Sequence, residues 1–169
     1  MAFHWGMALL ILALLLLGVL AANWPLSPLK LKLFFWHKSL GLLVLLLAGL
    51  RLLWRLFDTR PVWPATMPEG ERRLARLAHA ALYGLMLALP LSGWLINSAA
   101  DVPFRVFGLW PLPALVAPDE LVKSLAQGAH LALVLTLLAL LAAHVAAALR
   151  HHRRGDGVLA AMLPWRARS

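Results

Sequence analysis

Cysteine is absent from this sequence, and its absence excludes several kinds of redox and structural site together. Disulfides, thiolate zinc sites and iron–sulfur clusters all depend on cysteine sulfur. A haem attached covalently through a Cys-x-x-Cys-His motif depends on it as well. Any redox centre in this chain must therefore be held by other side chains.

Charged residues are also scarce, because they make up 14% of the 169 residues where about a quarter is usual in soluble domains. Hydrophobic residues make up 62% and gather into four long blocks. Each block has the roughly 20 residues that a helix needs to cross ~30 Å of hydrocarbon. We predict an all-α integral membrane four-helix bundle with helices over residues 2–22, 34–57, 74–97 and 120–152.

Little of the chain remains outside these helices, so residues 1–169 are expected to form a single domain. The first block resembles a signal peptide, because small residues occupy positions 18–22. No lysine or arginine precedes it, however, and it exceeds the roughly 7 to 15 residues of a signal core. We therefore expect a retained helix. The linker 58–68 is expected to be a loop at headgroup level, and the apolar loop 98–118 to fold along the membrane surface.

Acidic residues are fewer than basic ones, seven against sixteen, which gives a formal charge of +9. Nucleic-acid binding would need a basic face on a soluble module, so no nucleic-acid partner is expected. Eleven basic residues lie between the second and third blocks or after the fourth. The other five lie near the remaining loops: Lys30, Lys32, Lys38, Arg105 and Lys123. The positive-inside rule therefore predicts that both termini are cytoplasmic.

Histidines are the residues with the clearest chemical meaning, because an ionisable side chain inside a bilayer is costly and therefore a candidate for function. His130 and His144 lie 14 residues apart on the fourth helix. That spacing returns to within about 40° of one direction and separates the rings by ~21 Å along the axis. One helix face thus carries two rings at opposite depths. This arrangement suits two haems stacked across the bilayer, each with one axial imidazole from this helix.

Neighbouring helices supply the second ligands. His37 opens the second helix on the periplasmic side, level with His130, whereas His4 and His79 open the first and third helices at the cytoplasmic depth of His144. The periplasmic haem therefore has one candidate pair, and the cytoplasmic haem has His144 with either His4 or His79. An isolated histidine at a helix end is more often an interfacial residue, but four at matched depths favour haem. Iron with two imidazole ligands exchanges electrons and has no open position.

Three further positions accompany these histidines. Arg51 lies 14 residues after His37, on the same face and near the cytoplasmic haem, where it can pair with propionates. An ordinary helix-end arginine is the alternative. Gly41 and Gly128 lie close to the periplasmic ligands and would let a porphyrin approach the backbone, although small residues in membrane helices also serve helix packing.

The sequence resembles the bacterial cytochrome b561 family over nearly its whole length. That family shares a four-helix haem-binding fold with the cytochrome b subunits of nickel–iron hydrogenases and formate dehydrogenases. No single segment is specific, but the order and spacing are. The matching segments are His4-Trp5, His37-Lys38-Ser39-Leu40-Gly41 with Arg51 and Arg55, Leu77-Ala78-His79 with Tyr83, Leu89-Pro90-Leu91-Ser92-Gly93-Trp94, Phe107-Gly108-Leu109, His130 and His144.

The resemblance implies two haem b groups in a multi-pass protein of the bacterial inner membrane, one ligated by His4 with His144 and one by His37 with His130. In that interpretation His79 lies beside a haem or near a quinone site. The sequence departs from the family pattern at its start. Members commonly have a longer, basic stretch before the first ligand than the three residues found here, so His79 is kept as the alternative to His4.

The resemblance also implies electron exchange with the membrane quinone pool. His151 and His152 lie in the basic tail, where we expect solvated side chains or, for one of them, a place at a quinone headgroup. A short stand-alone member resembles a superoxide oxidase, which takes electrons from periplasmic superoxide and reduces ubiquinone. The basic residues of the periplasmic rim would attract superoxide. The alternatives are an anchor subunit between a hydrogenase or dehydrogenase partner and quinone, and a haem-free scaffold.

Overall fold

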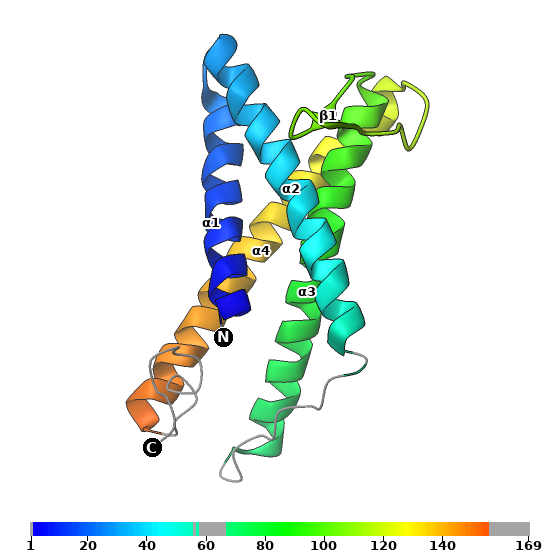
Figure 1. Cartoon of the computed structure of the whole chain (residues 1–169). Coiled ribbons are helices and arrows are strands. Elements are labelled where there is room, and N and C mark those ends of the chain that lie inside the picture. Colours follow the sequence, from blue (N-terminus) through cyan, green and yellow to red (C-terminus); the bar gives the residue numbers. More distant parts are fainter. Residues whose placement is uncertain (1, 56, 58–66, 156–169) are drawn as a thin grey trace.

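Four long helices make up most of the computed structural model, which describes residues 2–55, 57 and 67–155 (Figure 1). They are α1 (Ala2–Asn23), α2 (Pro28–Arg55), α3 (Glu69–Ala99) and α4 (Glu120–Arg154). Each is long and apolar enough to cross a membrane. The prediction of an all-α fold with four transmembrane helices is thereby confirmed.

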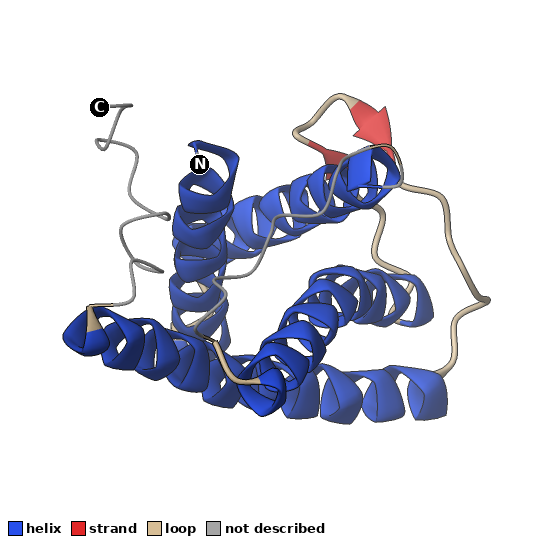
Figure 2. Cartoon of the chain, turned by 90° about the horizontal axis from the view of Figure 1, so that it is seen from below, coloured by secondary structure: helices blue, strands red, loops and turns tan. Residues whose placement is uncertain are grey.

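Successive helices run antiparallel. The start of α1 and the end of α4 therefore lie at one end of the bundle, and the strands β1 (Arg105–Val106) and β2 (Trp110–Pro111) lie at the other (Figure 1). We call these the termini end and the hairpin end. The close helix packings are α1 with α2, α2 with α3, and α3 with α4. Over the described residues, α4 makes no comparable approach to α1 or α2, and Figure 2 shows the helices from the termini end.

Few side chains are fully buried, and the buried apolar ones are mostly small or lie singly along the helices: Met7, Ala21, Val44, Ala48, Met67, Leu85, Ala99, Ala126 and Leu137. Many large apolar side chains are exposed instead, such as Leu16, Leu50 and Leu131. Lipid tails are as apolar as leucine, so this exposure costs nothing within a bilayer. The helices therefore present apolar surface outward and enclose only a small core.

The start of α2 differs from the prediction, which had a loop up to residue 33. The helix begins at Pro28. Ser27 caps it, because the Lys30 backbone N–H donates to Ser27 Oγ at 3.3 Å, and proline at the first helical position has no N–H to leave unpaired. The proline here starts a helix and does not extend a loop.

The start of α3 also lies earlier than residue 74, at Glu69 directly after Pro68. Glu69 and Glu71 in its first turn favour this start, since negative charge stabilises a helix N-terminus. Most of the predicted linker loop, residues 58–66, lies outside the described residues. At the end of α4, Gly155 adopts the left-handed conformation typical of a helix C-terminus.

A short antiparallel hairpin, which the sequence did not predict, lies between α3 and α4, where β1 pairs with β2. Its turn residues Phe107 and Gly108 have φ values of 51° and 74°, as tight hairpin turns require. Positive φ is unusual for phenylalanine, and the Phe107 N–H is held by a hydrogen bond of 3.1 Å to the fully buried Ser39 Oγ of α2. Leu109 and Trp110 stay exposed at the tip. The hairpin is therefore fixed to α2 and presents apolar side chains outward.

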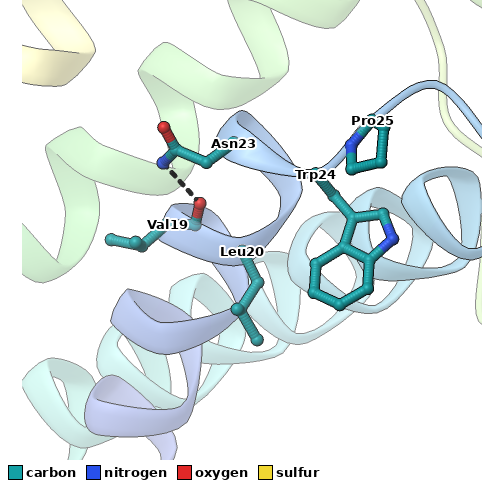
Figure 3. A pocket seen from close by; sticks show the side chains of 5 residues that line it. All are labelled: Val19, Leu20, Asn23, Trp24 and Pro25. Atoms are coloured by element: carbon teal, nitrogen blue, oxygen red, sulfur yellow. Dashed lines mark hydrogen bonds between the residues drawn. The ribbon is translucent and has the colours of Figure 1, made fainter.

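A shallow hollow lies at the turn between α1 and α2 (Figure 3). It is lined by Val19, Leu20, Asn23, Trp24 and Pro25. The Asn23 side-chain amide donates to the Val19 carbonyl at 2.8 Å, so its polar group is turned back onto its own helix. The hollow therefore offers mainly apolar surface, and none of its lining residues belongs to the histidine clusters.

Candidate functional site

Two pairs of histidine rings face each other across the bundle, one at each end. The ring centroids of His37 in α2 and His130 in α4 lie 6.4 Å apart, and those of His4 in α1 and His144 in α4 lie 6.3 Å apart. All four side chains are half-buried. The partners that sequence spacing placed at equal depth are thus neighbours in the structure. Each pair joins α4 to a helix that α4 does not pack against closely.

The spacing of both pairs suits a metal ion between two rings. A metal held about 2 Å from one nitrogen of each of two imidazoles, on opposite sides, separates the ring centroids by about 6.3 Å. The third histidine contact, between His79 and His144, has a centroid distance of 5.7 Å and is shorter than this span. The two cross-bundle pairs therefore match a doubly ligated metal better than the pair between α3 and α4.

The His37 ring is held in place by α1. Its Nδ1 lies 3.1 Å from the Leu14 carbonyl oxygen. A carbonyl can only accept, so Nδ1 carries the proton and Nε2 keeps its lone pair. Gly18, one turn after Leu14, makes room for this contact, since a Cβ there would lie 3.0 Å from Cε1 of the ring. His37 is therefore fixed in the form that binds a metal through Nε2.

The His130 ring is held in the same way by α3. Its Nδ1 lies 2.9 Å from Ser92 Oγ, and Ser92 Oγ donates to the Leu89 carbonyl at 2.8 Å. The single hydroxyl proton is directed to Leu89, so the hydroxyl accepts from His130 and Nδ1 is again the protonated nitrogen. Gly93 lies beside the ring, where a Cβ would be 3.7 Å from Cε1. His130 thus also keeps Nε2 for a metal.

Histidines of three helices meet at the termini end. His144 of α4 contacts His4 of α1 and also His79 of α3. His4 in turn stacks edge-on against Trp5, with a centroid distance of 5.6 Å. Both alternatives considered for the ligand opposite His144 therefore lie next to it. They differ in ring spacing and in the helix that carries them.

Arg51 lies in this same cluster, as its spacing from His37 predicted. Its guanidinium stacks over the Phe3 ring at 4.7 Å, and its Nε donates to Tyr83 Oη at 2.6 Å. The guanidinium of Arg55 lies over the ring of the same tyrosine, 5.3 Å from the Tyr83 ring centroid. Two cations therefore approach the histidines of the termini end, and Arg51 is among the electrostatic neighbours of His4.

The two glycines that sequence analysis singled out have open space beside them. Apart from the adjacent residues and the backbone of its own helix, no atom would lie within 4 Å of a Cβ added at Gly41 or Gly128. This is compatible with a porphyrin or with lipid at either position. Close approach of a porphyrin to Gly41 therefore stays a prediction.

His151 does not have the solvated surroundings that were one of the two expectations for it. It is only 7% exposed, with Nε2 3.8 Å from Glu71 Oε2. The other expectation, a place at a quinone headgroup, stays a prediction. Glu71 also accepts from Arg150 at 2.6 Å and Arg154 at 3.0 Å. The first turn of α3, which carries Glu71, reaches the last turns of α4, where this side chain is buried. His152 is exposed, as expected.

The basic residues of the hairpin end differ in their partners. Lys38 donates to Asn97 Oδ1 at 2.7 Å and lies 5.4 Å from the Phe104 ring centroid, so these contacts leave its charge uncompensated. Lys123, in contrast, pairs with Glu120 at 2.9 Å. Lys38 is therefore the basic residue that adjoins His37 in the sequence, and neither of these two partners carries a negative charge.

Sequence reasoning missed the residues that hold the histidine rings. Ser92 stood in a segment quoted for the family resemblance, but no role was assigned to it. Gly18 was considered only as part of a possible cleavage site. The Leu14 carbonyl carries no side-chain signal at all. The available signals were a serine and a glycine on the helices next to the ligands. Only the packing of the helices shows that these two residues face the histidine rings.

A comparison with known families now adds to this geometry. The family model for prokaryotic cytochrome b561 matches residues 1–165. The chain belongs to the prokaryotic cytochrome b561 family. Cytochrome b561 homolog 2 of Escherichia coli (strain K12) is 31% identical over 157 residues, which cover 89% of this chain and 81% of that protein. Cytochrome b561 homolog 1 of the same organism is 30% identical over 131 residues, covering 77% and 74%.

Membership of the prokaryotic cytochrome b561 family establishes the general function. The chain is a multi-pass bacterial membrane cytochrome that binds b-type haem and transfers electrons. The residues present fit such a group, because facing imidazoles have the spacing of a doubly ligated metal and two of them are fixed with Nε2 free. In addition, α4 does not pack closely against α1 or α2, the helices that carry the partner rings.

Replacing Gly18 by alanine should lower the haem content of the cytochrome by up to about half. The new methyl group would lie 3.0 Å from Cε1 of His37, so the ring must move away from the Leu14 carbonyl. Alanine favours a helix by about 1 kcal/mol over glycine, so α1 itself should not weaken. The haem-to-protein ratio of the purified variant measures the effect. Gly93→Ala is the matched control, since its Cβ would be at ordinary contact distance from His130. Equal haem contents in the two variants would contradict the prediction.

Proposed function

We propose that this cytochrome b561 holds two b-type haems and carries electrons from periplasmic superoxide to ubiquinone. The observation that carries the proposal is the repetition of one ring pair at two depths of α4. His130 and His144 are 14 residues apart, or about 21 Å along the helix, and each has a partner ring at nearly the same distance. Two such sites form a route for electrons between the two ends of the bundle.

In this proposal His37 and His130 hold one haem, and His4 and His144 hold the other. Two observations support His4 over His79 as the partner of His144. The centroid distance to His4 equals that of the other pair within 0.1 Å, whereas the distance to His79 is 5.7 Å. In addition, α3 packs closely against α4 and leaves little width for a porphyrin, while α1 does not.

Haem iron with two imidazole ligands supplies reversible one-electron transfer without binding a further ligand. At the termini end, the surrounding side chains supply positive charge for the haem propionates. Arg51 offers a guanidinium beside His4 that would pair with a propionate, and Tyr83 fixes the direction of that guanidinium. Arg55, which lies over the ring of Tyr83, adds a second positive charge.

We assign the hairpin end to the periplasm, following the positive-inside distribution of charge, in a bacterial inner membrane. Superoxide is a small anion, so a cation at the entrance to the His37 site would raise its local concentration. Lys38 suits this role, because it adjoins His37 and its partners Asn97 and Phe104 are uncharged. The pairing of Lys123 with Glu120 makes that lysine a weaker attractor.

We place ubiquinone at the termini end, where His79 and His151 face the interface of α3 and α4. His151 lies two turns beyond His144 on α4, and Glu71 of α3 adjoins it. In the complete reaction two superoxide anions each lose one electron and leave as dioxygen. Ubiquinone gains those two electrons with two protons and leaves as ubiquinol. His79 and His151 would hydrogen-bond the quinone oxygens.

Stopped-flow spectroscopy tests this function directly. Superoxide added to the oxidised holoprotein should reduce the haem, and a ubiquinone analogue should then reoxidise it. Lys38→Gln should slow haem reduction several-fold and weaken its dependence on ionic strength. Lys123→Gln is the control and should change the rate less. Failure of superoxide to reduce the haem would overturn the superoxide donor and favour the anchor subunit, which receives electrons from a partner protein.

A further inference from the structure

The two histidines at the hairpin end donate to acceptors of different kinds. His37 donates to the Leu14 carbonyl, a backbone group of α1. His130 has the Leu89 carbonyl of α3 beside its ring and, in addition, the side-chain hydroxyl of Ser92, which accepts from its Nδ1. A backbone carbonyl cannot be removed by substitution. Ser92 is therefore the point at which this chain can adjust one ligand of one haem.

Ser92 is itself held in place. Its hydroxyl donates to the Leu89 carbonyl in the preceding turn of α3 at 2.8 Å, a local bond that serine commonly makes within helices. The remaining lone pairs are then available to the 2.9 Å contact with His130 Nδ1. Gly93 lies beside the same ring, at ordinary van der Waals distance.

We propose that Ser92 is a positioning residue that orients His130 and sets the reduction potential of the haem at the hairpin end. The proposal rests on the proposed ligation of that haem by His130. By accepting from Nδ1, Ser92 selects the tautomer that leaves Nε2 as the metal-binding nitrogen and restricts rotation of the ring. It also makes the imidazole a stronger electron donor, as hydrogen-bonded partners of metal-binding histidines do.

Stronger donation stabilises ferric iron relative to ferrous iron, so the hydroxyl should keep this haem harder to reduce. Ser92→Ala should therefore raise its potential, with the equilibrium constant for reduction increasing by about three- to tenfold, the size expected for one neutral hydrogen bond. The haem of His4 and His144 should keep its potential, because among the described residues Ser92 bonds the ring of His130 and not those of His4 or His144.

The test is a redox titration of the purified holoprotein with spectra of the low-spin ferric haems. Their g values depend on the angle between the two imidazole planes, so they report orientation independently of electron-transfer activity. Ser92→Ala should shift one potential and one set of g values, and Ser92→Thr, which keeps the hydroxyl, should restore both. Thr136→Val is the matched control, since it removes an α4 hydroxyl that bonds the Ala132 carbonyl at 2.9 Å.

The outcomes separate this proposal from the proposed function. If Ser92→Ala keeps both haems with unchanged potentials and g values, the positioning role is wrong although ligation by His130 stands. If Ser92→Ala loses one haem, retention of that haem in Ser92→Thr supports the role and its loss in Ser92→Thr overturns it. If His130→Ala keeps both haems, the ligation fails and this proposal fails with it. An equal shift in Thr136→Val would also overturn it.

Discussion

Replacing His130 by alanine should remove about half of the haem from the purified protein and leave the haem at the termini end in place. His130 is the histidine of α4 at the depth of His37, and within the described residues His37 has no other histidine ring in contact. Iron left with a single protein ligand would lose much of its binding free energy. Superoxide should then no longer drive reduction of ubiquinone, because the entry site for electrons is lost.

The pyridine haemochrome assay gives the haem-to-protein ratio for this test. His152→Ala is the matched control, because His152 lies on the same helix, in its last turn, and is exposed. It should retain the full haem content. A full haem content in His130→Ala would refute the assignment of this ligand, and loss of all haem would mean that the two sites do not assemble independently.

Substitution of His4 by alanine should likewise remove about half of the haem, whereas His79→Ala should retain it. The reason is geometric: the His4 and His144 rings have the spacing of two ligands on one metal, and His79 lies closer on a helix packed against α4. His79→Ala should instead impair the oxidation of reduced haem by the quinone analogue, since we place His79 near the quinone.

The two variants are each the control for the other, measured by haem content and by the spectrum of the haem that remains. A reversed result, with haem lost from His79→Ala and kept in His4→Ala, would assign the ligand to α3. The haem that remains in His4→Ala should have the spectrum and the potential of the hairpin-end haem. A different spectrum would show that the loss occurred at the wrong site.

The sequence predicted the helices and the partners among the histidines for simple physical reasons. Length and hydropathy determine which segments can cross a bilayer. The 14-residue spacing on α4 and the alternating direction of successive helices determine depth, so His37 was matched to His130, and His144 to either His4 or His79, without any coordinates. The choice of His4 over His79 came from the family resemblance. The structure brings both pairs together.

Rotation of each helix about its axis was beyond this reasoning, and the missing details follow from that. Whether Gly18 or Ser92 faces a histidine depends on which side of α1 or α3 packs inward, and apolar residues surround α1 on all sides and give no direction there. The hairpin was missed because its strands are two residues long and its turn uses a phenylalanine at positive φ. The burial of His151 was missed because it depends on Glu71 of a distant segment.

The loose approach of α4 to α1 and α2 has a consequence for how the protein is assembled. Helices α3 and α4 pack along each other, as do α1 and α2, but these two hairpins contact each other mainly through α2 and α3. Each proposed haem would connect α4 to α1 or α2 through its pair of ligands and so join helices that do not pack closely against each other. We therefore expect insertion of the two helical hairpins to precede cofactor binding, and cofactor binding to complete the tertiary structure. Protease sensitivity of the membrane-inserted chain should accordingly follow the supply of haem.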